Sequence, residues 1–126
     1  MRLLLDTHAW LWWLSDDRRL GKEARQALAN PRSEVYVSAA TAWEIAIKMA
    51  LGKLRVQKAD LDAEIVANGF LELPIRTRHA LHAGRLAPLH EDPFDRMLVA
   101  QAEVEDLAVV SADPVFEGYG VSVLDA

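Results

Sequence analysis

The sequence predicts an α/β domain built around a parallel sheet, and two observations support this. Short runs that are almost entirely apolar, such as RLLLD at residues 2–6 and LAVVSAD at residues 107–113, are typical of strands buried on both faces. These runs alternate with segments of helical periodicity, as in parallel strands joined by helical crossovers. The 126 residues contain no internal repeat or low-complexity tract. We therefore expect a single domain over residues 1–126 with one core.

Five strands are expected, at residues 2–6, 34–38, 70–75, 107–113 and 121–124. The second, EVYVS, is rich in the β-branched and aromatic residues that strands favour. The third and fifth, FLELPI and VSVL, are shorter apolar runs. Parallel sheets place their functional sites at the carboxyl ends of the strands, so candidate functional residues are expected just after these runs.

Helical patterns separate the strands, at residues 9–14, 21–30, 39–52, 58–68, 77–86 and 93–105. Asn30-Pro31 closes the second helix, and Gly52 fits the C′ position of the third. Asp92 fits the N-cap of the last helix, because Pro93 then takes the first helical position. The preceding stretch, APLHEDP, is expected to be a loop.

Composition and charge exclude several classes of protein. Because there is no cysteine, disulfides, thiolate metal sites and cysteine nucleophiles are excluded. The chain has 14 Lys and Arg against 19 Asp and Glu, a net charge of −5, which is not typical of a protein that binds nucleic acid through cationic surface alone. Asp6 and His8 interrupt the N-terminal apolar run, and no stretch approaches the roughly 18 apolar residues of a membrane span. We expect a cytoplasmic protein with no membrane partner.

Four acidic residues fall near the expected carboxyl edge of the sheet. Asp6 and Asp113 end the first and fourth strands, Glu44 follows the second strand, and Asp95 begins the helix that leads into the fourth. The aspartates also have an ordinary interpretation as cap or turn residues. Glu44 has an ordinary alternative too, since Lys48 lies four residues later and could pair with it. Glu44 is assigned to an apolar helix stripe formed by Ala40, Trp43, Ile47, Ala50 and Leu51.

If these four acids converge, electrostatics requires a cation. Two carboxylates about 4 Å apart repel by about 4 kcal/mol at an effective dielectric constant near 20. Several such repulsions together approach the whole stability of a small domain. Oxygen ligands select hard divalent ions, so the pattern predicts a site for Mg²⁺ or Mn²⁺. Such ions can activate water for attack on a phosphodiester and supply the positive charge that this acidic chain lacks.

The same residues carry a resemblance to a known family. LLLDTHAWLWWL, VSAATAWEIAIKMALGKL, LPIRTRHALHAGRLAPLHEDPFDRMLVAQA and VVSADPVFEGYGVSVL, in this order, resemble the PIN-domain proteins of the VapC toxin type. The resemblance covers essentially the whole chain. It implies a three-layer α/β/α sandwich with a central parallel sheet and a Mg²⁺- or Mn²⁺-dependent endoribonuclease. It also implies a homodimer and a cognate VapB-type antitoxin, as in type II toxin–antitoxin systems.

The resemblance also implies roles for particular residues. The acidic quartet of the family falls on Asp6, Glu44, Asp95 and Asp113, with the three aspartates as the stronger metal-ligand candidates. Glu44 would bind the ion directly, through water, or orient the attacking water. Thr7 and Ser111 would support the acids, and Asp92 would cap the helix that carries Asp95. Lys48 and Arg96 are candidate contacts to the substrate.

Other enzyme classes fit the sequence less well. Phosphatases of the haloacid dehalogenase type place two aspartates two residues apart after the first strand, whereas Asp6 is followed by Thr7 and His8. The chain has no P-loop and no dinucleotide fingerprint. His79 and His82 have helical spacing for zinc, but with no further ligand nearby we expect a surface helix.

A non-catalytic domain that binds RNA or a protein remains the alternative from a different class. Its binding surface would be basic residues, which more often form a solvated face. Binding of divalent ions discriminates the two, because a pure binding domain has no use for the acidic quartet. The four tryptophans could stack on bases, although core or dimer contacts are the more ordinary expectation: Trp10, Trp12, Trp13 and Trp43.

Overall fold

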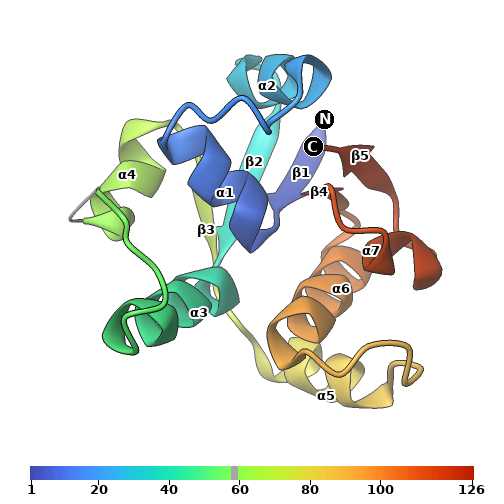
Figure 1. The fold of residues 1–126 in the computed structure, drawn as a ribbon. Coiled ribbons are helices and arrows are strands. Elements are labelled where there is room, and N and C mark those ends of the chain that lie inside the picture. Colours follow the sequence, from blue (N-terminus) through green and yellow to red (C-terminus); the bar gives the residue numbers. More distant parts are fainter. Residues whose placement is uncertain (58–59) are drawn as a thin grey trace.

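The computed structural model describes residues 1–57 and 60–126 and contains one five-stranded sheet (Figure 1). The strands are β1 (Arg2–Leu5), β2 (Glu34–Ser38), β3 (Leu71–Leu73), β4 (Ala108–Ser111) and β5 (Val123–Asp125). Their order is β3-β2-β1-β4-β5, and every neighbouring pair is parallel. The five predicted strands and the parallel sheet are thus confirmed. The third strand is shorter than predicted, and it stops before Pro74, which has no N–H to donate to a neighbouring strand.

The described helices include every one that the sequence predicts and one that it does not. They are α1 (Thr7–Leu14), α2 (Lys22–Ala29), α3 (Ala39–Ala50), α4 (Leu61–Ala67), α5 (Thr77–Arg85), α6 (Pro93–Glu105) and α7 (Val115–Gly118). The short α7 lies between the fourth and fifth strands, where the sequence pattern predicts no element. Lys58, where the fourth helix was predicted to begin, lies outside the described residues. Of the helices described, none is both long and apolar enough to cross a membrane.

Helices cover both faces of the sheet, as Figure 1 shows. Successive residues of a strand point to opposite faces. Leu3 and Leu5 of β1 therefore pack in a cluster with Trp10 of α1, together with residues of α2 and α4. Leu4, between them, packs on the other face in a cluster with Leu98 of α6 and Phe116 of α7. These layers form the three-layer α/β/α sandwich that the sequence predicts.

The carboxyl edge of the three central strands is where helices begin. Asp6 follows β1 directly and is the N-cap of α1. Ser38 ends β2 and is the N-cap of α3, with its hydroxyl oxygen accepting from the N–H of Ala40 at 3.0 Å. Ser111 ends β4, and the N–H of Asp6 donates to the carbonyl of the preceding Val110 at 3.1 Å. Because these strand ends are neighbours, polar residues distant in the sequence meet at this edge.

Candidate active site

Asp6 is a buried carboxylate at the end of the central strand. Its Oδ1 accepts a hydrogen bond from the N–H of Ala9 at 2.7 Å, so it caps α1. Its Oδ2 accepts from the hydroxyl of Ser111 at 2.5 Å. Burial nevertheless raises the pKa of Asp6 above its ordinary value. Asp6 is therefore both the cap that the ordinary interpretation expects and an acid held at the sheet edge.

Asp113 lies on the other side of Ser111. The hydroxyl oxygen of Ser111 accepts from the N–H of Asp113 at 2.9 Å while the same hydroxyl donates to Asp6. The exposed carboxylate of Asp113 accepts from the N–H of Val115, at 3.0 Å, where α7 begins. Its negative charge is close enough to contribute to the raised pKa of Asp6. Ser111 therefore holds these two acids next to each other.

Glu44 is a buried carboxylate on α3 with a partner for each oxygen. Thr7 donates its hydroxyl to Oε1 at 2.6 Å, and the ammonium group of Lys48 lies 2.8 Å from Oε2. The ordinary alternative, a Glu44–Lys48 pair one turn apart, is thus present in the structure. Thr7 follows Asp6 in the chain, so it connects the end of β1 to α3.

The stripe predicted for α3 is correct for Ala40 and Glu44, which are buried, and wrong for Trp43 and Leu51. The helix buries Ala40, Thr41, Glu44 and Ile45, whereas Trp43 and Leu51 are 62% and 64% exposed. The buried face thus includes two polar residues, of which the sequence pattern places Glu44 but not Thr41. Of the two ordinary expectations for the tryptophans, core or dimer contact, the exposure of Trp43 excludes only the core for this residue.

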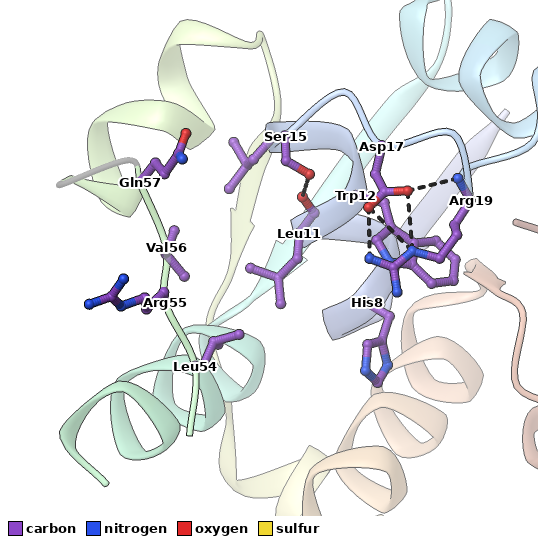
Figure 2. A pocket seen from close by; sticks show the side chains of 11 residues that line it. His8, Leu11, Trp12, Ser15, Asp17, Arg19, Leu54, Arg55, Val56 and Gln57 are labelled. Atoms are coloured by element: carbon purple, nitrogen blue, oxygen red, sulfur yellow. Dashed lines mark hydrogen bonds and ion pairs between the residues drawn. The ribbon is translucent and has the colours of Figure 1, made fainter. Parts of the chain in front are cut away.

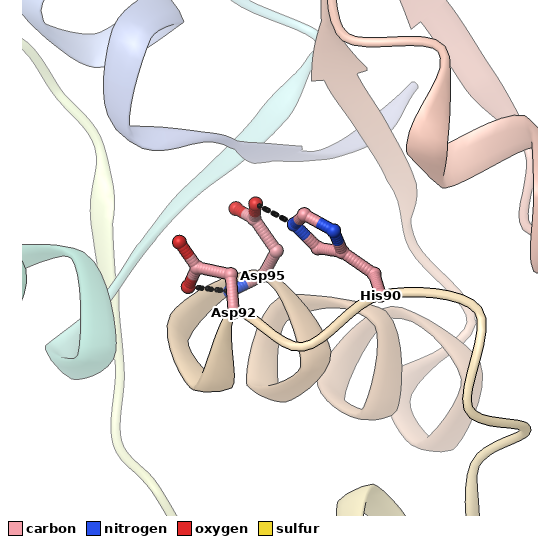
Figure 3. Close-up of side chains that lie close together, drawn as sticks. All are labelled: His90, Asp92 and Asp95. Carbon is pink, nitrogen blue, oxygen red and sulfur yellow. Dashed lines mark hydrogen bonds and ion pairs between the residues drawn. The ribbon is translucent and has the colours of Figure 1, made fainter.

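Asp95 lies at the amino end of α6, next to two residues that precede it (Figure 3). Asp92 caps the helix as predicted, with Oδ1 accepting from the N–H groups of Phe94 at 2.8 Å and Asp95 at 3.2 Å. The Asp95 carboxylate pairs with His90, whose Nε2 lies 2.9 Å from Oδ2. Burial raises the pKa of Asp95 to about 6, and the charges of Asp92 and Glu44 act in the same direction.

His90 was missed by the sequence reasoning, which assigned its segment to a loop. Within residues 1–57 and 60–126, the group of three metal-type ligands whose atoms all lie within 4.8 Å of one another is His90, Asp92 and Asp95. The four predicted acids do not form such a group among these residues. The signal in the sequence was that His90 lies five residues before Asp95, just ahead of the helix that Asp92 caps.

The structure therefore places the predicted acids in two groups at one edge of the sheet. Ser111 bridges Asp6 and Asp113. Glu44 and Asp95 repel each other electrostatically. The ammonium group of Lys48 is attracted by both of them and by Asp92. Thr7, which follows Asp6 and binds Glu44, connects the two groups. The arrangement concentrates negative charge, of which one lysine offsets a part.

Arg96, a candidate substrate contact, is engaged elsewhere. Its guanidinium donates to the carbonyls of Ala83, Leu86, Ala87 and His90 and to the hydroxyl of Tyr119, at 2.9–3.3 Å. These bonds connect α5, the loop after it and the residue that follows α7 to the amino end of α6. They also fix the backbone of His90, and with it the histidine that pairs with Asp95.

The expected surface position of the two helical histidines is wrong for His79. Its side chain is fully buried, whereas that of His82 is 35% exposed and lies 3.3 Å from Glu103. His79 Nδ1 accepts from the N–H of Arg76 at 3.0 Å, and its Nε2 lies 2.9 Å from Glu105. Both ring nitrogens are thus used within the fold.

A cavity of about 550 Å³ adjoins the site along α1 (Figure 2). At one end is His8, two residues after Asp6, and the far wall is the segment that contains Leu54 and Arg55. Arg19 lies over the ring of Trp12, 5.3 Å from its centroid, and pairs with Asp17 at 2.7 Å. The cavity is thus apolar along α1, with charged groups at its rim.

Comparison with known proteins identifies the family. The profile described as PIN domain matches residues 3–121. The chain belongs to the PIN domain family. No curated protein sequence gives a significant match to this PIN domain.

Solved structures share the fold of this PIN domain. It is similar to a chain of VapBC2 from Rickettsia felis bound to a promoter DNA fragment, with TM-score 0.73, 13% identity and 98% of both chains covered. DNA-bound VapBC from Salmonella typhimurium gives TM-score 0.68 and 17% identity, over 99% of this chain and 98% of that one. FitAcB from Neisseria gonorrhoeae gives TM-score 0.64 and 20% identity, over 98% and 96%. At these identities the likeness concerns the fold.

Proposed function

We propose that this PIN domain is a Mg²⁺- or Mn²⁺-dependent endoribonuclease, the toxin of a VapBC-type toxin–antitoxin system. The observation that carries the proposal is the gathering of Asp6, Glu44, Asp95 and Asp113 at the carboxyl edge of a PIN fold. Structural stability does not account for this arrangement, because burial raises the pKa values of Asp6 and Asp95. A protein tolerates such acids where they serve chemistry.

The residues present fit a hard divalent ion. All four acids offer carboxylate oxygens, the ligands that Mg²⁺ and Mn²⁺ prefer. The raised pKa values of Asp6 and Asp95 show that these carboxylates lack full compensation from protein groups, which a cation would supply. Asp6, Asp95 and Asp113 would hold the ion, and Glu44 would bind it directly or through water. When bound, the ion would activate a water molecule and offset the charge that builds up on the phosphate.

The neighbouring side chains fix these acids in place. Ser111 orients Asp6 and the backbone of Asp113, and Thr7 orients Glu44. Asp92 caps α6 and so supports Asp95 at its tip. In this proposal they are positioning residues, which hold the carboxylates at this edge of the sheet without contacting the substrate.

Lys48 is the proposed contact to the substrate phosphate. Its side chain is 43% exposed and its ammonium group lies among the acids, 2.8 Å from Glu44. When a divalent ion takes over the charge of Glu44, this ammonium group becomes available for a phosphate oxygen. Arg96 is given a structural role instead, because its guanidinium is bound to carbonyls of the chain itself.

The partners are proposed from the similar structures. VapBC2 from Rickettsia felis and VapBC from Salmonella typhimurium are bound to DNA in those structures, and another is described as a toxin–antitoxin complex from Klebsiella pneumoniae. By analogy, we propose that this chain pairs with a VapB-type antitoxin, forms a homodimer and acts on RNA in the cytoplasm. The mechanism would leave a 5′-phosphate and a 3′-hydroxyl.

The non-catalytic alternative has one observation in its favour. Lys48 pairs with Glu44, so part of the acidic charge is offset without any ion. A PIN domain that only bound RNA or a protein would need no more than this. It would, however, gain nothing from adding Mg²⁺ or Mn²⁺, which separates the two proposals.

The test is cleavage of total cellular RNA by the antitoxin-free protein, with Mg²⁺, with Mn²⁺ and with EDTA. Asp95→Asn should lower the cleavage rate by at least about 100-fold, because a ligand of the ion is lost. Glu91→Gln is the matched control, since this exposed acid lies in the same segment but outside the site. Cleavage that survives EDTA, or an Asp95→Asn protein that cuts at the wild-type rate, would contradict the assignment.

A further inference from the structure

An exposed aromatic pair bridges the two helices that carry Glu44 and Asp95. Trp43 of α3 packs edge-on against Phe94 of α6, with ring centroids 5.4 Å apart and an interplanar angle of 76°. The tryptophan is 62% exposed, whereas Phe94 is half-buried. The pair therefore leaves most of the indole surface accessible to solvent, although aromatic side chains of this size are seldom left so exposed.

The position of this pair ties it to the proposed active site. Trp43 precedes Glu44 in α3, and Phe94 precedes Asp95 in α6. The two acids are close enough for the charge of Glu44 to act on Asp95. The aromatic contact thus lies beside the acids and crosses the same gap between helices.

The supporting contacts hold the pair in place. Phe94 donates its N–H to the Asp92 carboxylate, so its backbone is fixed by the helix cap. On α3, Trp43 lies between two buried residues, Thr41 and Glu44, which anchor the helix to the interior. An exposed ring on a fixed backbone is a preorganised surface for a flat ligand, because little conformational freedom is lost on binding.

We propose that Trp43, held by Phe94, is a stacking platform for a base of single-stranded RNA next to the bond that is cut. This inference rests on the proposed function and specifies how the substrate is held there. The acidic edge repels RNA except where the ion and Lys48 contact phosphate, so affinity has to come from uncharged contacts as well. Stacking supplies it, and because every base has a π-face, it would tolerate different sequences.

The experiment measures binding of a fluorescein-labelled, mixed-sequence, 12-nucleotide single-stranded RNA by fluorescence anisotropy in Mg²⁺. The measurement uses an Asp113→Asn background, which should prevent cleavage because a proposed ligand of the ion is lost. Trp43→Ala should weaken binding about tenfold, whereas Trp43→Phe should keep most of the affinity, because a phenyl ring still stacks. Leu51→Ala is the matched control: Leu51 is 64% exposed at the end of the same helix and should not affect binding.

A second strand, with abasic sites in place of the bases, isolates the stacking contact. Trp43→Ala should have no effect on its binding, because there is no base left to stack. Equal losses on the normal and abasic strands would overturn the proposal, as would unchanged binding of the normal strand. If Trp43→Ala and Leu51→Ala both change the oligomeric state in light scattering and weaken binding equally, the face is a contact between copies and the proposal is wrong.

The outcomes separate this inference from the proposed function. If the wild-type chain cleaves RNA in a metal-dependent way and Trp43→Ala leaves RNA binding unchanged, the stacking platform is wrong and the proposed nuclease stands. Binding that depends on Trp43 and on the bases, without cleavage in Mg²⁺ or Mn²⁺, would leave the platform and overturn the nuclease.

Discussion

The two ends of α6 carry the same chemical pair and use it in opposite ways. At the amino end His90 lies 2.9 Å from Asp95, and at the carboxyl end His79 lies 2.9 Å from Glu105. Yet the pKa of Asp95 is raised to about 6, whereas that of Glu105 is lowered. A histidine beside a carboxylate therefore does not by itself decide which charge state the fold favours.

The surroundings decide it. Asp95 is partly buried, which removes much of its contact with water, and it faces the charges of Asp92 and Glu44. The lowered pKa of Glu105 comes first from its hydrogen bond to His79, with a further contribution from Arg78, whose guanidinium lies 2.7 Å away. The ion pair at the carboxyl end of α6 thus stabilises the fold, whereas the ionised form of Asp95 at the amino end is unfavourable without a cation.

The largest effect on stability is expected at the carboxyl end. Replacing His79 with Ala leaves a cavity, removes the acceptor for the Arg76 N–H and takes the partner from Glu105. We expect the free energy of unfolding to fall by about 4 kcal/mol, measured by urea denaturation. His82→Ala, which removes a partly exposed histidine on the same helix, should cost less than about 1 kcal/mol. Equal losses in the two variants would show that the buried pair does not anchor α5 to α6.

A smaller effect with a definite sign is expected from pH at the amino end. Because the folded-state pKa of Asp95 is about 6, above its ordinary value of 3.8, its contribution to stability is present at low pH and is lost as pH rises through 6. In EDTA, Asp95→Asn and the wild type should be about equally stable at pH 4. At pH 7.5 the variant should be more stable by about 2–3 kcal/mol.

Glu105→Gln is the matched control for this pH series. The lowered pKa of Glu105 means that its contribution is present above its ordinary value of 4.5 and is lost as pH falls. This substitution should therefore destabilise the protein at pH 7.5 and matter less near pH 3. If both substitutions shift stability in the same direction at pH 7.5, the proposed contrast between the two ends of α6 fails.

The same contrast explains what the sequence could and could not predict. The composition of RLLLD and EVYVS predicts strands, and Asp92-Pro93 predicts the start of α6, because these signals are local. The burial of His79 and the pairing of His90 with Asp95 depend on which helix lies beside which. The sequence pattern of α3 places Glu44 on the inward face, but it does not reveal that Thr41 also faces inward and Trp43 outward. The burial and the charge state that tertiary contacts impose on a side chain cannot be predicted from one sequence.

The smallest expected effect, a rise in melting temperature on adding Mg²⁺, tests whether the unfavourable acid has a purpose. At a tenfold excess over its dissociation constant, an ion that binds only the folded state stabilises it by about 1.4 kcal/mol, or roughly 5 °C for a domain of this size. Asp95→Asn should abolish the shift, because a ligand at the amino end of α6 is lost. Glu105→Gln should lower the melting temperature yet keep the shift, since its carboxylate lies at the other end of the helix. A shift that survives Asp95→Asn would mean that the ion binds elsewhere, and that the raised pKa of Asp95 has a cause other than a metal site.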